Sequence, residues 1–297
     1  MTKKTATVAD ASIHSRALLV WLTISTWSAR KYDRKISDEV NAKYAATSDA
    51  GRYNKFLLPG DAVAYKSLVT ISTGIRHAHY AHTLAWSDEG WRLLPTANYM
   101  DYTTWFRKQQ LAFQTSLTEF TAAYPAMRAQ AKSLLTGMYR DEDYPSPQDM
   151  QARFALDVKY SPLPNFGDVR VDLADDQVAA IEADIASRIN DSVAVAVKDA
   201  WARLYTSVER IHERLADPAA IFRDSLIENA RDVCNALQRL NVTQDPKLDA
   251  MRQRVQTELT AFEPDILRDT PRVRAKVADQ ANKIMQSMAQ FYQPEAQ

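Results

Sequence analysis

Apolar side chains recur at every third or fourth position through the last 120 or so residues of the chain. From Val178 to Leu215 the spacing is that of one long amphipathic helix. Two further stripes, over residues 248–262 and 273–291, predict two more helices, and residues 221–240 predict a helix between the long helix and these two. All six glycines lie at or before Gly167, which favours uninterrupted helix beyond that point because Gly weakens helix interiors. We therefore predict an elongated antiparallel helical bundle.

Cap residues followed by proline mark helix starts in this half. The pattern occurs at Asp217-Pro218, Asp245-Pro246 and Thr270-Pro271, where the first side chain can accept a bond from a free amide and Pro needs no donor. Asp175 is the expected cap of the long helix. Short connections between such helices favour neighbours that pack side by side.

The first half has a mixed pattern. Its β-branched and aromatic runs predict strands at residues 18–27, 55–58, 83–86, 91–94 and 168–173. Its longer periodic segments predict helices at residues 33–46, 61–80, 99–124, 125–135 and 146–160. Ser87-Asp-Glu-Gly90 joins the third and fourth strands as a hairpin turn. The expected fold is α+β and predominantly helical, with a mixed head over residues 1–174 and a long-helix bundle or stalk over residues 175–297.

Composition narrows the class of protein only slightly. The chain is 46% hydrophobic and 25% charged with zero net charge, so no global field attracts nucleic acid or an anionic membrane. Residues 1–174 carry 21 Lys and Arg against 17 Asp and Glu, and the remainder carries 16 against 20, so two copies could attract one another. The single cysteine, Cys234, excludes a disulfide within the chain, and no apolar run could span a bilayer. We expect a soluble intracellular protein.

Several phrases of the first half resemble one family of bacterial and phage proteins. They are Ile24-Ser-Thr-Trp27 with Arg30-Lys31, Thr83-Leu-Ala-Trp86 with Gly90-Trp-Arg-Leu-Leu-Pro95, Tyr144-Pro145, and Tyr160-Ser-Pro-Leu-Pro164 with Asp168-Val-Arg-Val171. Together they are similar to the domain-of-unknown-function family numbered 3150, over about residues 15–175; the family's turn has Pro where Ala85 stands. The resemblance implies a phage or mobile-element origin, a location in the cytoplasm of a bacterial host cell and, as partners, a MoxR-type AAA+ ATPase or a von Willebrand A-type protein. It implies no catalytic residues.

A basic run beside aromatic residues is a candidate nucleic-acid site. Arg30, Lys31, Arg34 and Lys35 lie near Trp27 and Tyr32, and Arg52 and Lys55 follow in the sequence. Cations that follow phosphates and rings that stack on bases are the usual means of binding single-stranded DNA. The alternative is that Trp27 is a core residue and that the charges lie on a solvated helix start.

Other residues suggest an interface or a metal site. Trp86, Trp91 and Arg92 surround the hairpin turn and could form one wall of a binding surface, and Arg268, Arg272 and Arg274 lie at a helix start, where cations oppose the helix dipole. His77, His79 and His82 form a histidine cluster, but their spacing prevents all three from converging within one regular element. Asp141-Glu-Asp143 lacks the ligand spacing of a calcium loop.

The sequence favours a binding protein over an enzyme. It contains no phosphate-binding glycine loop, no nucleophile elbow and no zinc-protease motif, and it implies no cofactor. The first hypothesis is a structural or interaction protein that self-associates, as a homo-oligomer, or docks a partner through its helical half. The second is a phage protein that binds single-stranded nucleic acid, and the third is a metal-dependent enzyme that uses the histidine cluster.

Overall fold

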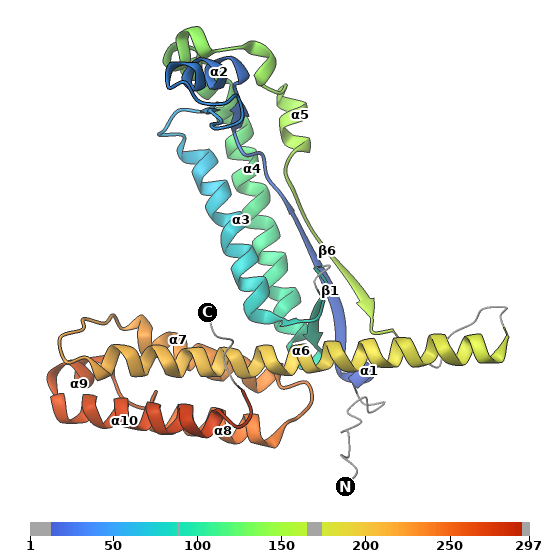
Figure 1. The fold of residues 1–297 in the computed structure, drawn as a ribbon, viewed down its shortest axis with the longest axis vertical. Helices are drawn as coiled ribbons and strands as arrows, with labels where there is room; N and C mark the ends of the chain where they lie inside the picture. The colour runs from blue at the N-terminus through green and yellow to red at the C-terminus, as the bar shows by residue number, and fades with distance from the viewer. Residues whose placement is uncertain (1–12, 88–89, 165–173, 293–297) are drawn as a thin grey trace. The chain divides into compact units, whose positions relative to one another are not determined.

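The protein is a predominantly helical α+β protein with a small antiparallel sheet, as the sequence predicts (Figure 1). The computed structural model describes residues 13–87, 90–164 and 174–292. The helices are α1 (Ile13–Arg16), α2 (Arg34–Lys43), α3 (Val63–His82), α4 (Tyr99–Leu135), α5 (Pro147–Ala152), α6 (Asp175–Ala216), α7 (Ser225–Leu240), α8 (Pro246–Glu258), α9 (Pro264–Asp269) and α10 (Pro271–Met288). Short 3₁₀ helices lie at Thr96–Asn98, Thr136–Met138 and Asp141–Asp143.

The strands form two separate sheets. They are β1 (Ala17–Ser25), β2 (Arg30–Tyr32), β3 (Asn54–Phe56), β4 (Leu84–Ala85), β5 (Arg92–Pro95) and β6 (Ala155–Pro162). The larger sheet has the order β4-β5-β1-β6, and the smaller one pairs β2 with β3. In the larger sheet β5 pairs antiparallel with both β1 and β4, so the hairpin predicted from the sequence is present.

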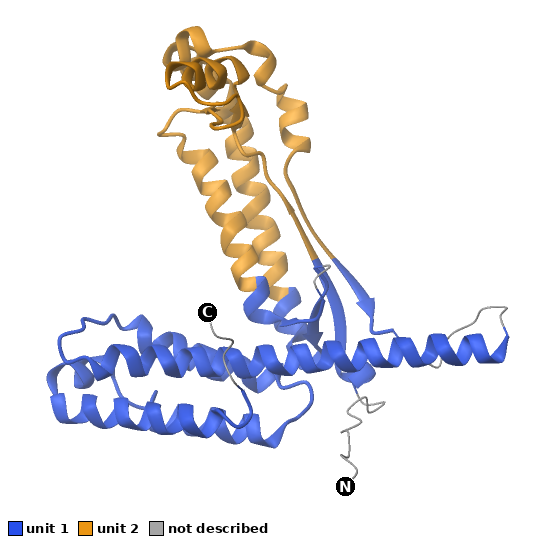
Figure 2. Ribbon diagram, viewed as in Figure 1, with its two compact units in different colours: residues 1–21, 79–103, 159–297 blue, residues 22–78, 104–158 orange. Residues whose placement is uncertain are grey.

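The chain forms two compact units, each made of segments that are distant in the sequence (Figure 2). Unit 1 comprises residues 1–21, 79–103 and 159–297, and unit 2 comprises residues 22–78 and 104–158. The chain therefore passes between the units within β1, α3, α4 and β6. Unit 2 carries 15 Lys and Arg against 11 Asp and Glu, a net charge of +4, which leaves unit 1 at −4.

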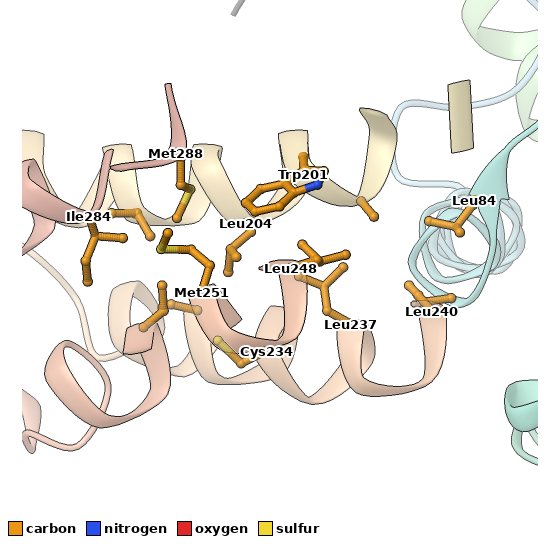
Figure 3. Close-up of a cluster of buried hydrophobic side chains, with 14 of the residues drawn as sticks. Leu84, Trp201, Leu204, Cys234, Leu237, Leu240, Leu248, Met251, Ile284 and Met288 are labelled. Carbon is orange, nitrogen blue, oxygen red and sulfur yellow. The ribbon is translucent and has the colours of Figure 1, made fainter. Parts of the chain in front are cut away.

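The core of unit 1 joins the helical half to the hairpin. α6 packs against α7, α8 and α10, and the buried stripe of α6 runs from Ile189 to Leu215. Figure 3 shows Trp201 and Leu204 of α6 packing with Leu237 of α7 and Met288 of α10. Leu84 of β4 belongs to the same cluster. The compact units consequently do not divide the chain at residue 174, because the hairpin segment buries its apolar side chains against α6 and α7.

Unit 2 has an aromatic core of its own. Trp27 makes edge-to-face contacts with Tyr65 and Tyr124, at centroid distances of 6.4 and 6.0 Å. Phe120 of α4 packs against Tyr65 and against Phe154, which precedes β6. Ring pairs of this kind contribute about 0.5–1.5 kcal/mol each beyond their buried area. The core is built where α3 and α4 meet the segments that flank β2 and β3.

Several element boundaries agree with the sequence pattern because local caps set them. Asp33 accepts a hydrogen bond from the Ile36 amide at the start of α2, Ser146 caps α5, and Asp245 caps α8. Gly90 has a φ of 96°, the left-handed conformation expected for the hairpin turn. The long helix is continuous as predicted, although Asp175 is its first residue rather than its cap.

Three predicted elements are wrong in extent. α4 continues through Pro125 instead of ending before it, because Phe113, Phe120 and Tyr124 on one side of the proline and Ala131 on the other are buried in the same core. The helix that begins at Pro147 ends at Ala152, and residues 155–162 form β6. Asp217-Pro218 ends α6 rather than starting a helix, and α7 begins at Ser225.

Other predictions fall outside the described residues. The strand predicted at residues 168–173 and the turn residues Asp88 and Glu89 belong to the ranges that the structure does not describe. Among the helices that are described, none combines the length and the apolar character needed to cross a bilayer.

Candidate nucleic-acid interface

β2 and β3 form a two-stranded ribbon in unit 2. Arg30 pairs with Phe56, Lys31 with Lys55, and Tyr32 with Asn54. The ribbon is extended at one end by a bond from the Asp33 amide to the carbonyl oxygen of Tyr53. α2 follows β2 directly, with Asp33 as its cap. This local order places the basic run of the sequence on one strand and on the first turn of a helix.

The ribbon has two faces of different chemistry because side chains alternate along a strand. The outer face carries Arg30, Tyr32, Asn54 and Phe56, all of which are exposed. The opposite, inner face carries Lys31 and Lys55, and Lys55 is only 2% exposed. The burial of β3, in which only the middle residue is covered, agrees with this assignment.

Each ring on the outer face has a guanidinium group against it. The Cζ atom of Arg30 lies 4.7 Å from the ring centroid of Phe56, and that of Arg52 lies 5.8 Å from the centroid of Tyr32. A cation over a ring contributes about 0.5–1 kcal/mol at exposed sites. Phe56 is nevertheless 61% exposed and Tyr32 is 42% exposed, so both rings keep surface available to a ligand.

Exposed aromatic side chains are concentrated around this ribbon. Among the described residues, the exposed aromatic side chains are Tyr32, Tyr44, Tyr53, Phe56, Tyr80 and Tyr160. Four of these six lie within residues 30–56, and Lys43 lies 5.8 Å from the ring centroid of Tyr44. Solvent-exposed rings beside cations are the arrangement that proteins use to stack unpaired bases and to hold the adjoining phosphates.

The inner face of the ribbon is held by a buried ion triad. The Nζ atom of Lys55 lies 3.3 Å from Oδ2 of Asp33 and 2.7 Å from Oδ2 of Asp143, and it donates a 2.8 Å hydrogen bond to the carbonyl oxygen of Met138. Burial favours the neutral carboxyl group of Asp33, but bonds from the Ile36 amide and from Lys55 outweigh it and lower the pKa of Asp33. The triad therefore fixes the ribbon to α2 and to the segment that contains Met138 and Asp143.

A cleft of about 750 Å³ opens beside the inner face. Its lining contains cations and carboxylates in equal number: Lys31, Arg34, Lys35, Lys55 and Arg140, and Asp33, Asp38, Glu39, Glu142 and Asp143. Most exposed cations of the cleft already have a partner, at 3.7–3.8 Å, as in the pairs Arg34–Asp38 and Lys35–Glu39. Such exposed pairs contribute only about 0–1 kcal/mol and can be exchanged for a phosphate.

The structure places the residues predicted for nucleic-acid binding in two different environments. Arg30, Lys31, Arg34 and Lys35 are exposed. Trp27 is 7% exposed and packs in the core of unit 2, so its ring is not available to a base.

Phe56 is the exposed ring that the sequence did not point to. The alternation of Asn54-Lys55-Phe56 as a strand could have indicated it, because residues 54 and 56 then share a face opposite Lys55.

The acidic residues at 141–143 make contacts within the protein, since Asp141 pairs with Arg128 and accepts a hydrogen bond from Tyr139.

The three histidines do not meet at one point. His79 and His82 lie near the end of α3, where the Nδ1 atom of His79 lies 2.9 Å from the hydroxyl of Tyr102, and Nδ1 of His82 lies 3.4 Å from the Asn98 amide nitrogen. Burial lowers the pKa of His79 to about 3 and also lowers that of His82. His77 is exposed, two residues before His79 and so on the other side of the helix. Within the described residues, no three His, Cys, Asp or Glu side chains are placed to hold a metal ion.

The hairpin residues predicted to form an interface make contacts inside unit 1. Trp86 is buried in the core, and Trp91 makes an edge-to-face contact with Trp21 at 5.5 Å. Arg92 donates to the hydroxyl of Thr83 at 2.7 Å and lies 3.5 Å from Oδ2 of Asp199. Oδ2 of Asp199 also accepts a bond from the amide of Ala85, which ties β4 to α6.

Two of the three basic residues predicted near the start of α10, Arg268 and Arg274, also make contacts within unit 1. Arg274 donates to the carbonyl oxygens of Arg214 and Leu215 in the last turn of α6, and to two further carbonyls in the loop that follows. Arg268 pairs with Asp224 and Asp265. Arg272 is exposed. Arg274 thus satisfies the helix-end carbonyls that would otherwise lack donors.

Comparison with known proteins adds nothing to this geometry: no family model, no curated protein and no solved structure matches the chain. The resemblance to family 3150 stays a prediction from the sequence. The geometry of the ribbon is therefore the basis for a candidate function.

Proposed function

We propose that this protein binds single-stranded nucleic acid through the β2–β3 ribbon, using the rings of its outer face and the exposed Lys31 at the cleft beside its inner face. The observation that carries the proposal is the pair of exposed rings, Tyr32 and Phe56, each beside an arginine on one face. Unpaired bases would stack on these rings, and Arg30, Arg52 and Lys31 would contact phosphates. A duplex keeps its bases stacked inside, so the rings would add little to duplex binding.

Charge supports the same site. Unit 2 has a net charge of +4, although the whole chain is neutral. Among the described residues, no carboxylate forms an ion pair with Lys31, unlike Arg34 and Lys35 beside it. Lys31 is therefore the cation of the cleft that a phosphate can reach without displacing a partner.

The test is fluorescence polarisation with labelled single-stranded and duplex oligonucleotides of the same length, titrated at several salt concentrations. Phe56→Ala should weaken single-strand binding roughly 5- to 150-fold, because stacking contributes about 1–3 kcal/mol per base. Lys31→Gln should instead reduce the slope of log K against log salt by about 0.7, the contribution of one phosphate contact on a single strand.

Tyr80→Ala is the matched control. Tyr80 is 47% exposed and has the Arg92 guanidinium 4.7 Å from its ring centroid, but it belongs to unit 1. Its replacement should leave binding unchanged. Equal affinity for single strand and duplex, or wild-type affinity of both Phe56→Ala and Tyr32→Ala, would refute the proposal.

Self-association is a second candidate function, and one observation favours it. The stripe of α6 from Ile189 onward is covered within unit 1, but Ile181 in its second turn is 37% exposed and Val178 and Ile185 are partly exposed. The opposite charges of the two units would attract a second copy. Light scattering after size exclusion should then give a mass above that of one chain, which Ile181→Lys reduces. A strict monomer at every concentration would rule this out.

The other partners stay predictions of the sequence resemblance. They are the MoxR-type AAA+ ATPase and the von Willebrand A-type protein, together with the phage or mobile-element origin and the cytoplasmic location. A pull-down with the full chain would test the two partners.

A further inference from the structure

The buried triad on the inner face of the ribbon has a geometry that allows covalent chemistry. Lys55, Asp33 and Asp143 have side chains that are 2%, 8% and 6% exposed. They come from β3, from the cap of α2 and from the 3₁₀ helix Asp141–Asp143, so no two are near neighbours in the sequence. One amine and two carboxyl groups thus share a buried site on the face of the ribbon opposite the rings of Tyr32 and Phe56.

The contact between Lys55 and Asp143 is close but lacks the angles of a hydrogen bond. Nζ lies 2.7 Å from Oδ2 of Asp143, yet that oxygen accepts no hydrogen bond from any described residue. Nζ is oriented instead by the bond that it donates to the carbonyl oxygen of Met138 at 2.8 Å. Nζ is thus held beside the carboxyl group that it would attack, and positioning of this kind can remove a large part of an activation barrier.

We propose that Lys55 and Asp143 join as an intramolecular amide, with Asp33 as the residue that moves the proton. The ammonium first gives one proton to the carboxylate of Asp143, which leaves a neutral amine and a neutral acid. The Nζ lone pair then attacks Cγ of Asp143 and a C–N bond forms. Asp33 takes a proton from the nitrogen and returns it to the departing hydroxyl, so that a C–O bond breaks and water leaves. The ion pair supplies every atom of the amide and the water, and no oxidant or co-reactant is needed.

The surroundings favour each step. Burial disfavours charged groups, so proton transfer from the ammonium to the carboxylate is less costly here than in water. Tyr144, next to Asp143, is 5% exposed and stacks on Tyr139 with centroids 4.9 Å apart, so the chain is buried on this side of Asp143. Asp33 lies 3.3 Å from Nζ, which places its carboxylate within reach of the proton that the nitrogen loses. The cleft, which all three residues line, gives the water a way out.

The experiment is the intact mass of the full-length protein, measured under denaturing conditions after incubation at neutral pH. The amide should lower the mass by one water relative to the sequence. Digestion should then give a branched peptide that joins the segments around Lys55 and Asp143, with no cleavage after Lys55. A protein with the full sequence mass and a linear Lys55 peptide would overturn the proposal.

Three variants separate the roles of the residues. Lys55→Met should restore the full sequence mass. Asp143→Asn should still form the amide but release ammonia in place of water. Asp33→Asn keeps a good helix cap, so the protein should fold, as circular dichroism would check, but should keep its full mass because the proton carrier is gone. An amide that forms equally fast in Asp33→Asn would show that Asp33 takes no part.

Discussion

Acidification should destabilise unit 1 through the buried imidazole of His79. His79 is 2% exposed, and its pKa falls to about 3, first because burial disfavours its charged form and second because Arg92 and His82 repel a positive charge. In the unfolded chain a histidine has a pKa of about 6.5. Between these values the unfolded state binds a proton that the folded state does not, so stability is complete above about pH 6.5 and is lost as the pH falls.

The size of the effect follows from the two pKa values. At pH 5 the unfolded histidine is almost fully protonated and the folded one is neutral, which costs about 2 kcal/mol relative to pH 7.5. The assay is urea unfolding at both values of pH, followed by tryptophan fluorescence, since Trp86 and Trp201 are buried in the same unit. Burial also lowers the pKa of His82, which adds to the total change, so the informative quantity is the difference between wild type and a variant.

His79→Gln is that variant, because an amide oxygen can still accept a bond from the Tyr102 hydroxyl but does not titrate in this range. Its loss of stability between pH 7.5 and pH 5 should be smaller than that of wild type by about 2 kcal/mol. His77→Gln, an exposed position of α3, is the matched control and should leave the wild-type difference unchanged. Parallel pH profiles for wild type and His79→Gln would refute the reasoning.

Three further changes test contacts that hold unit 1 together, each measured by urea unfolding. Asp199→Ala should cost about 3 kcal/mol, since it leaves two arginines that are about one-fifth exposed without a carboxylate, and Asp199→Asn should cost less because it still accepts the Ala85 amide. Arg274→Ala should cost about 1–3 kcal/mol, because carbonyls at the end of α6 lose their donor, and equal stability would contradict that role. Gly90→Ala should cost about 1–2 kcal/mol, because its φ is 96° and the added carbon would meet the Trp21 ring at 3.2 Å; an unchanged midpoint would show that the turn relaxes.

The sequence predicts those parts of the fold that depend on local physical chemistry. A three- to four-residue period is sufficient for α6, and Asp33 and Asp245 set helix starts by binding nearby amides. Pro125 shows the limit of this reasoning. A proline costs about 3 kcal/mol inside a helix, but the aromatic core that α4 shares with α3 keeps the helix continuous, and no local pattern reports that core.

The pairing of strands that are distant in the sequence could not be predicted either. The stretch Ala155–Pro162 alternates weakly, and only its pairing with β1 makes it a strand. The compact units could not be read from the sequence either, because each is assembled from segments separated by dozens of residues. The sequence pointed to the charges of the candidate site and to Tyr32, but it missed Phe56 and added Trp27. Trp27 is as suitable for a core as for a surface, and only its contacts with Tyr65 and Tyr124 decide between them.

The ribbon also explains how one short strand can anchor unit 2 through Lys55 and present an exposed ring, Phe56, to a ligand. Because side chains alternate in direction along a strand, Lys55 and Phe56 lie on opposite faces although they are adjacent in the sequence. Lys55 is fixed by two carboxylates and a carbonyl, whereas Phe56 is 61% exposed. A rigid inner face keeps the outer rings in a constant orientation, which lowers the entropy lost when a base stacks on them. Changes at Phe56 should therefore affect binding with little effect on stability, whereas changes at Lys55 should affect stability first and binding only as a consequence.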